Sequence, residues 1–225
     1  MAVVTILREL GSGGGEVGRQ AAHHLGYDYV DKDVIEGIFR QYGLTKFEDL
    51  YNTMPSSLDM INYSNLLIVS MLNEIIEAVA QRGNAVLLIR SGFAILGGCA
   101  DVLNVRIHAP VSVRAPRIMG REQLADLWQA EQQITEDDKM RRKFLQMFYD
   151  KHWEDESQFD LVLDTGALTL EAATEQLVAA AQAVAARPLG AGATTTAKFK
   201  VDPVLADAVA KVLAYPLPAL ADEAA

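Results

Sequence analysis

The chain has 225 residues, of which half are hydrophobic and 7% aromatic, and 20 basic against 30 acidic side chains leave a net charge of −10. This length predicts one large domain, or one domain with a small attachment, with a mainly aliphatic core. The excess of acid repels nucleic acid backbones and anionic lipid, so we expect neither nucleic acid nor a membrane as a partner. The single cysteine, Cys99, excludes an intrachain disulfide and favours a cytoplasmic location.

Short apolar runs alternate with helical patterns along the chain. In chain order the sequence predicts strand 3–7, loop 11–15, helix 16–25, strand 27–30, helix 33–43, a polar turn-like stretch 46–57, helix 65–82, strands 85–90 and 102–109, charged helices over 111–151, strand 161–163 and helix 169–186. This alternation predicts an α/β fold in which helices cover both faces of a parallel sheet.

The composition changes near residue 187. Residues 188–200 are typical of a linker, and Asp202-Pro203 is a favourable start for a short helix ending near residue 215. The region 188–225 is therefore predicted to be a linker and a short C-terminal helical tail. Its amphipathic helix is a candidate surface for a protein partner or for a second copy of the chain.

The most informative local feature is the glycine loop between the first strand and the first helix. Its glycines let several backbone N–H groups converge, and the following helix N-terminus adds partial positive charge, so the segment is suited to bind phosphate. The alternative is a plain strand-to-helix turn. If it binds a nucleotide, the predicted binding residues are Gly11, Ser12, Gly13, Gly14, Gly15 and Glu16.

Two classes of nucleotide site fit this loop. Residues 13–18 (GGGEVG) match the dinucleotide pattern G-x-G-x-x-G, with Asp31 or Asp33 near the distance expected of a ribose-binding acid. However, five residues separate Leu7 from Gly13, and a long loop before the helix is the P-loop layout. The full P-loop pattern is not matched, because its lysine is missing.

Taken together, several segments resemble the cytidylate kinase-like family of P-loop nucleoside monophosphate kinases. They are residues 5–35 (TILRELGSGGGEVGRQAAHHLGYDYVDKDVI), 86–96 (VLLIRSGFAIL), 105–122 and 137–173. The resemblance implies a P-loop NTPase-like three-layer core over residues 1–187, with an acceptor-binding insertion at about 33–80 and a helical lid at about 112–152. It also implies transfer of phosphate from ATP to CMP or a related monophosphate, with Mg²⁺.

The loop departs from the pattern of true cytidylate kinases. Gly14 stands where the lysine belongs, Glu16 replaces the magnesium-binding Ser or Thr, and Gly15 lacks the basic side chain that relatives often carry. A P-loop lysine offsets charge on the transferring phosphoryl group. The sequence therefore leaves open an active kinase, a weak or inactive nucleotide-binding regulatory module and, third, a dinucleotide-dependent oxidoreductase.

The missing charge has candidate sources elsewhere in the sequence. Arg8 follows the first strand, at the sheet edge where open α/β folds bind ligands. Arg117, Arg121 and Arg141 match basic positions of the family in the lid, and Asp31 matches an acid near the acceptor. Each has a structural alternative: an ion pair with Glu9 for Arg8, a solvated helix face for the lid arginines, and helix capping for Asp31.

Overall fold

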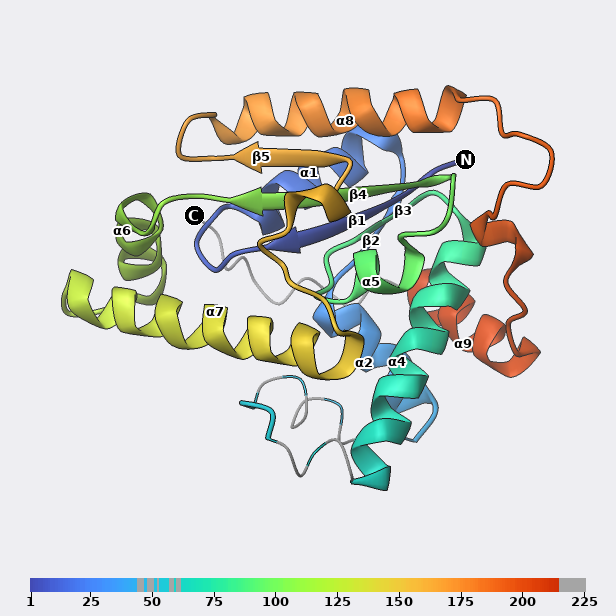
Figure 1. Ribbon diagram of the computed structural model, residues 1–225, viewed down its shortest axis with the longest axis horizontal. Helices are drawn as coiled ribbons and strands as arrows, with labels where there is room; N and C mark the ends of the chain where they lie inside the picture. The colour runs from blue at the N-terminus through green and yellow to red at the C-terminus, as the bar shows by residue number, and fades with distance from the viewer. Residues whose placement is uncertain (44–46, 48–50, 52, 57–58, 60–61, 215–225) are drawn as a thin grey trace.

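The computed structural model describes residues 1–43, 47, 51, 53–56, 59 and 62–214. Five parallel strands form one sheet in the order β2-β3-β1-β4-β5 (Figure 1). They are β1 (Val3–Arg8), β2 (Asp28–Val30), β3 (Ala85–Leu87), β4 (Val102–His108) and β5 (Leu161–Asp164). The predicted α/β fold with a parallel sheet is confirmed.

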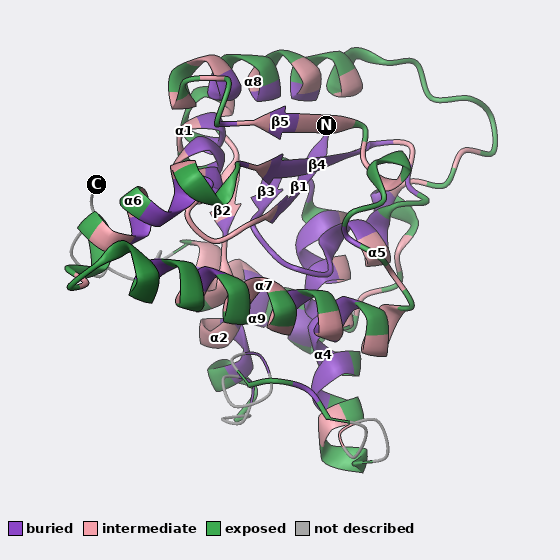
Figure 2. Ribbon diagram, turned by 60° about the vertical axis from the view of Figure 1, so that its left-hand side comes forward, coloured by how far each residue is buried: buried purple, intermediate pink, exposed green. Residues whose placement is uncertain are grey.

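Helices cover both faces of the sheet, so the core has three layers (Figure 1). On one face, α1 (Gly14–Leu25) and α8 (Leu170–Ala186) pack together on the sheet through side chains such as Val17, Ala21 and Leu177. On the other face lie α2 (Lys32–Gln41), α4 (Tyr63–Arg82), α5 (Gly92–Leu96) and α9 (Pro203–Ala214). Figure 2 shows the buried residues concentrated in the sheet and in the helices of this second face.

A long helical hairpin stands at the carboxyl edge of the sheet. It consists of α6 (Val111–Glu122) and α7 (Leu127–Tyr149), which pack through Ala115, Ile118, Ala130 and Ile134. Toward its C-terminal end α7 joins the main core with Phe144 and Leu145. The charged region 111–151 therefore does form helices, as predicted, and one end of the hairpin is anchored in the core.

Two segments differ from the sequence prediction. The third strand was expected over 85–90 but ends at Leu87, and the chain turns through buried residues into α5, which the sequence analysis missed. A continuous apolar run fits a buried turn as well as it fits a strand. The stretch 46–57 lies partly outside the described residues, but Phe47 and Tyr51 are helical and buried, so it is not simply a polar turn.

Helix α4 is the one described helix with the length and composition to span a membrane, with a mean hydropathy of 1.2. Half of its most apolar stretch is buried in the protein, including Leu72, Ile75, Ile76 and Val79. The helix packs as a core helix, so its apolar face is already covered.

The C-terminal segment is docked on its own chain. Buried Leu205 and Val209 of α9 pack in the same core cluster as α2 and α4. Ahead of α9, η2 (Thr196–Lys198) is fixed by the backbone and hydroxyl of Thr196, which both donate to Asp101, at 2.7 Å for the hydroxyl. The predicted helix is present and starts at Pro203 as expected, but its amphipathic face is covered by the same chain.

Because α9 packs on α2 and α4 of its own chain, removing a buried side chain of α9 should destabilise the protein. Leu205→Ala is expected to lower the free energy of unfolding by about 2–4 kcal/mol, because a fully buried leucine side chain leaves a cavity. Val204→Ala on the same helix is the matched control, since Val204 is 66% exposed, and should change stability by less than about 0.5 kcal/mol. Urea denaturation measures both, and equal effects would show that α9 is not docked.

Candidate functional site

The first turn of α1 is an uncapped helix start at the carboxyl edge of the sheet. Several other helices begin with a side chain that accepts from the first turn, as Asn62 of α4, Asp126 of α7 and Thr169 of α8 do. Helix α1 instead begins at Gly13, which has no side chain to accept. Within the described residues, no protein group accepts from the N–H groups of residues 13–16. These free donors and the helix dipole form a place for an anion.

The carbonyl groups of the glycine loop are held away from that place by other elements. Arg114 donates to the carbonyl of Leu10 at 3.2 Å, and Arg117 donates to the carbonyl of Gly11 at 3.3 Å. The hydroxyl of Thr165, just after β5, donates to the carbonyl of Ser12 at 2.6 Å. Since three consecutive carbonyls are bound from outside, the N–H groups that follow are the polar groups left to a ligand.

Ser12 takes part in the loop itself. Both its backbone N–H and its hydroxyl donate to the carbonyl of Glu9, at 3.2 Å and 2.8 Å. Gly11 and Gly13 adopt positive φ angles of 78° and 75°, which favour glycine and produce the sharp curl. Of the residues predicted to bind phosphate, Gly13 to Glu16 therefore present free N–H groups, while Gly11 and Ser12 shape the loop.

Three arginines gather beside the start of α1. Arg8 ends β1, Arg90 follows β3, and Arg141 comes from α7. Arg90 and Arg141 are 4% and 6% exposed. The pKa of Arg8 and that of Arg90 are each lowered to about 10, first by burial and also by the other arginines of the group. Arg141 lowers the pKa of both Arg8 and Arg90, and Arg8 lowers that of Arg90, as like charges near one another do.

One carboxylate faces this group of three arginines. Arg141 forms an ion pair with Asp137 one turn before it, with a second contact of 3.1 Å between Nη2 and Oδ1. Burial opposes ionisation of Asp137, but the charge and hydrogen bond of Arg141, together with the charges of Arg90 and Arg8, outweigh it and lower the pKa of the carboxyl. Among the described residues, Asp137 is the carboxylate paired with this group of three guanidinium groups, so positive charge is in excess there.

Arg90 is held by an aromatic side chain rather than by an acid. Its guanidinium lies over the ring of Tyr51, 4.1 Å from the centroid, and donates to the carbonyl of Tyr51 at 2.6 Å. Within the described residues, its Nε and the hydroxyl of the adjacent Ser91 are buried without a hydrogen-bond partner. Buried donors without partners are costly, so they mark a place where an anionic ligand binds favourably.

The other predicted residues lie apart from this group. Asp31 caps α2 by accepting from the N–H groups of Asp33 and Val34 at 3.0 Å and 3.2 Å. Arg121 pairs with Glu122 near the end of α6. Arg8 does not pair with Glu9, which binds Arg106 at 3.2 Å instead. The sequence indicated no such role for Thr165 or Arg114, because contacts to loop carbonyls have no local sequence pattern.

A profile of the cytidylate kinase-like family matches residues 3–167, well over half of the 225 residues. The chain belongs to the cytidylate kinase-like family. The match includes the glycine loop, the three arginines and both helices of the hairpin. It ends before α8 and α9.

Solved structures with the same fold are distant in sequence. An uncharacterized protein from Eubacterium ventriosum is 19% identical, with a TM-score of 0.64 over 81% of this chain and 98% of that one. Shikimate kinase from Bacteroides thetaiotaomicron is 12% identical, with a TM-score of 0.51 over 80% of this chain and 98% of that one. At these identities the likeness shows the fold, which is that of P-loop kinases.

A curated relative shares part of the sequence. A uronate isomerase from Corynebacterium glutamicum is 30% identical over 125 residues, which are 53% of this chain. The chain spans only 24% of the length of that protein. The match therefore concerns a segment of a much larger protein.

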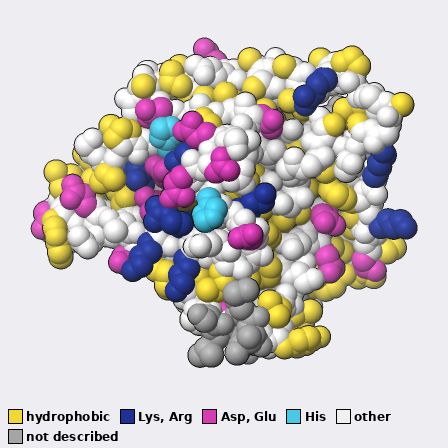
Figure 3. Space-filling model, in the orientation of Figure 1, with side chains coloured by type: hydrophobic (Ala, Val, Ile, Leu, Met, Phe, Trp, Pro, Cys, Tyr) yellow, Lys and Arg dark blue, Asp and Glu magenta, His cyan; other side chains and the backbone are white. Residues whose placement is uncertain are grey.

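The face in front of β5 and α7 carries charges of both signs, including histidines (Figure 3). Ion pairs formed by residues of β4 and α7 include Arg106 with Glu9 and Glu156, and Arg142 with Glu154. The exposed pair of Arg142 and Glu154 contributes little energy, whereas Arg106 and Glu9 are only 11% and 12% exposed. Among the described residues, Arg8 and Arg90 form no ion pair, and Arg90 is buried.

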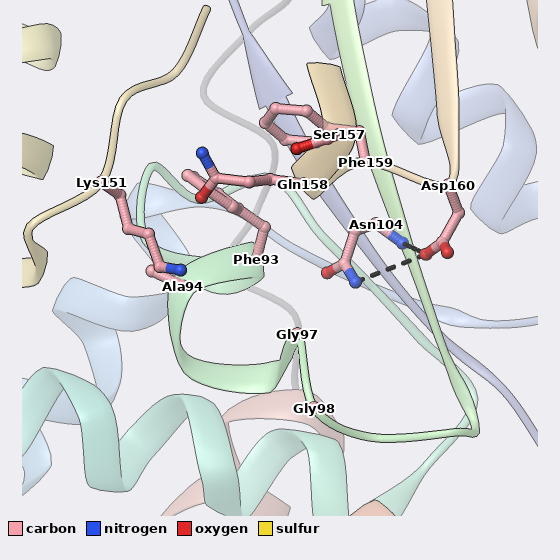
Figure 4. A pocket seen from close by; sticks show the side chains of 10 residues that line it. All are labelled: Phe93, Ala94, Gly97, Gly98, Asn104, Lys151, Ser157, Gln158, Phe159 and Asp160. Atoms are coloured by element: carbon pink, nitrogen blue, oxygen red, sulfur yellow. Dashed lines mark hydrogen bonds between the residues drawn. The ribbon is translucent and has the colours of Figure 1, made fainter. Parts of the chain in front are cut away.

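A cavity of about 270 Å³ opens on the α5 side of the sheet, away from the glycine loop. Figure 4 shows the side chain of Gln158 beside Phe93 and that of Lys151 ending near Ala94, while the backbone N–H and side-chain amide of Asn104 donate to Asp160. None of the residues predicted for the site lines it. The cavity is therefore separate from the candidate site.

The first turn of α1 also bears on the Mg²⁺ that the family implies. No cluster of three His, Cys, Asp or Glu occurs in the described part of the chain. Mg²⁺ in kinase sites needs only one or two carboxylates, because substrate phosphates and water complete its shell. Glu16 offers one; it pairs with Arg19 through side chains 44% and 61% exposed, a weak contact that a cation can displace. The residues present fit the ion.

The Asp137–Arg141 pair predicts a pH-dependent stability. Asp137→Asn is expected to cost about 3 kcal/mol near neutral pH, because it leaves a buried guanidinium unpaired. Since the folded pKa of Asp137 is lowered, the pair stabilises the protein above the ordinary carboxyl pKa of about 3.9 and loses its effect as pH falls through the lowered value. The difference in the free energy of unfolding between Asp137→Asn and wild type should therefore become smaller below about pH 4.

Asp207→Asn provides the control for this experiment. Asp207 forms the same i,i+4 contact with Lys211 on α9, but both side chains are more than 60% exposed. Its loss should cost about 0.3–0.5 kcal/mol. Urea denaturation across the acid range compares the two variants, and a pH-independent cost at Asp137 would contradict the assignment.

Proposed function

We propose that the protein transfers a phosphoryl group from ATP to a nucleoside monophosphate, most simply CMP. The observation that carries the proposal is the row of free N–H groups at the start of α1 beside three incompletely neutralised arginines. Two anion sites next to each other are what phosphoryl transfer between two phosphate-bearing molecules requires. Membership of the cytidylate kinase-like family supports the same reaction.

The donor belongs at the glycine loop. The N–H groups of Gly13 to Glu16 would bind the β- and γ-phosphates of ATP, with the dipole of α1 adding to the attraction. Mg²⁺ held at Glu16 would neutralise charge on those phosphates when bound. The contacts of Arg117 and Thr165 with the loop carbonyls keep these donors in place, so their role is positioning.

The acceptor phosphate belongs between Arg90 and Arg141. Arginine binds phosphate through two parallel N–H groups, and both side chains are buried and fixed. The unpartnered Nε of Arg90 and hydroxyl of Ser91 supply further donors. Asp31, expected at the acceptor, is already used as a helix cap, and this favours the arginines as the anchor.

The chemical step needs little from the protein beyond placement. An anionic oxygen of the acceptor phosphate forms a bond to the γ-phosphorus as the bond from that phosphorus to the β,γ-bridging oxygen breaks. ADP leaves with that oxygen, and no proton or electron is exchanged with the protein. Arginines beside the transferred group stabilise the charge spread over its oxygens.

The family's regional roles complete the proposal. Residues 33–80 would hold the acceptor nucleotide, and the hairpin within 112–152 would act as the lid that excludes water, with Arg121 at its exposed part. Residues 1–187 would act as one catalytic unit in the cytoplasm, and residues 188–225 would be an appendage to it.

A second candidate is a kinase-derived module that binds a nucleotide without turnover. The absence of a lysine at residue 14 favours it. The third class, a dinucleotide-dependent oxidoreductase, fits poorly, because the sheet order β2-β3-β1-β4-β5 differs from the 3-2-1-4-5-6 order of dinucleotide-binding folds.

Calorimetric titration with ATP, CMP and NAD, together with a coupled assay for ADP release, separates the three candidates. Binding of ATP and CMP with CMP-dependent ADP release is the expected result. Binding without turnover would favour the regulatory module. Binding of NAD alone would favour the oxidoreductase, and the absence of any nucleotide binding would rule out all three.

Arg90→Met tests the acceptor site. Loss of a charged hydrogen-bonding group costs about 1.5–3 kcal/mol, so the variant should bind CMP roughly 10–100-fold more weakly while ATP affinity changes little. Arg82→Met, at the opposite edge of the sheet and paired with Asp28, removes the same charge and should leave both affinities unchanged. Thermal unfolding of each variant shows that it is folded, and equal weakening for ATP and CMP would argue against a separate acceptor site.

A further inference from the structure

Arg8 is the arginine of the site without a bonded partner. It lies at the end of β1, paired in register with Ile107 of β4. The other arginines of the site and of its supports, Arg90, Arg114, Arg117 and Arg141, each donate to a protein oxygen. Among the described residues, no hydrogen bond or ion pair takes the guanidinium of Arg8. Its charge is therefore available to a ligand.

The stem of Arg8 lies against Gly14, the residue that stands at the lysine position of the P-loop. A Cβ atom at residue 14 would lie 2.8 Å from Cβ of Arg8, and 3.4 Å from Cδ of Arg8 and from Cβ of Ile107. These are rigid or constrained atoms, so a side chain at residue 14 does not fit without a shift. At Gly15, by contrast, the nearest atom would be 3.8 Å away, an ordinary contact.

We propose that Arg8 replaces the missing lysine: its guanidinium, projecting from the strand past Gly14, supplies the positive charge that binds the terminal phosphate of a polyphosphate held at the start of α1. This assignment rests on the proposed function for its role in turnover. The contact between Arg8 and a Cβ atom at residue 14 also limits which residues can occupy the two positions. Residues 8 and 14 cannot both carry a long side chain here, so the site takes its charge from the strand instead of from the helix.

The surroundings of Arg8 agree with this role. The groups that act on it electrostatically are Arg141 from α7, Tyr51, Tyr29 from β2 and Asp137 from α7. The repulsion from Arg141 is stronger than the attraction to Asp137, its ion-pair partner. Burial is the largest influence and lowers the pKa of Arg8 to about 10, which leaves it protonated near neutral pH. A bound phosphate would relieve the cost of burying this charge.

Inorganic tripolyphosphate is the probe, because it carries the phosphate chain of ATP without a base. Wild-type protein is expected to bind it at one site by calorimetry, and Arg8→Met should weaken binding at least about tenfold, the loss of one charged hydrogen-bonding group. Arg8→Lys should retain most of the affinity. Arg82→Met is the charge-matched control and should stay within about twofold of wild type.

The decisive variant moves the charge from the strand to the helix. Arg8→Gly removes the Cβ that excludes a side chain at residue 14, and combining it with Gly14→Lys places a lysine in the vacated space. The double variant should recover at least half of the affinity lost in Arg8→Gly, measured on a logarithmic scale. Gly14→Lys alone should lower the Tm and gain no affinity, because Arg8 still fills the space.

Several outcomes would overturn the assignment. They are wild-type protein that fails to bind tripolyphosphate, an Arg8→Met variant that binds it normally, or a folded double variant that binds no better than Arg8→Gly. Thermal unfolding of each variant checks that it is folded. Arg8-dependent tripolyphosphate binding without transfer to CMP would contradict the proposed function and support Arg8, whereas normal transfer in Arg8→Met would contradict the Arg8 assignment alone.

Discussion

The candidate site depends on how the backbone of residues 10–12 is held. Every peptide has a donor and an acceptor, and a phosphate attracts one and repels the other. Here Arg114, Arg117 and Thr165 donate to the loop carbonyls from positions 104, 106 and 153 residues further along the chain. The donors that follow are left at the end of α1. A glycine loop can bind an anion only when its carbonyl groups are turned away and its N–H groups are left free. Here the residues that bind the carbonyls come from α6 of the hairpin and from the end of β5.

The candidate site is positively charged although the protein as a whole is acidic. The chain carries a net charge of −10, which is unfavourable for long polyanions. Arg90 and Arg141 are buried and Arg8 is half-buried, and their fields act over a short range where the dielectric constant is low. A small phosphate ligand that enters the site replaces its contacts with water by contacts with these arginines. An extended polyanion would instead be repelled by the acidic surface. The location of the charge, rather than its total, selects the ligand.

Much of the fold follows from the sequence, but less of the site does. The buried runs 3–7 and 102–109 predicted β1 and β4 almost to the residue, because apolar runs between turn signals have few alternatives. The strand predicted over 85–90 was too long, because the chain leaves the sheet after Leu87 in a turn that buries Arg90 and Ser91. That turn depends on tertiary packing. Arg8 and Arg141 were named as separate candidate sources of charge, and their electrostatic proximity in the structure was not predictable from the sequence.

The reason lies in the kind of contact. Asp31 was assigned to the acceptor by resemblance, yet a local capping geometry, readable from its place before α2, accounts for it. Thr165 reaches Ser12 across 153 residues of sequence, and Arg117 reaches Gly11 across 106. Such contacts depend on strand order, which one sequence does not reveal. Local chemistry was therefore predictable, and long-range support was not.

The position of α9 has a consequence for how the protein is made. Helix α9 follows every strand of the sheet in the chain, yet it covers α2 and α4 near the middle of the fold. The last strand of the sheet ends earlier, at Asp164. During synthesis the phosphate-binding edge can therefore assemble first, while the apolar face of α2 and α4 stays uncovered until α9 has been made. That interval is when the nascent chain is most exposed to aggregation.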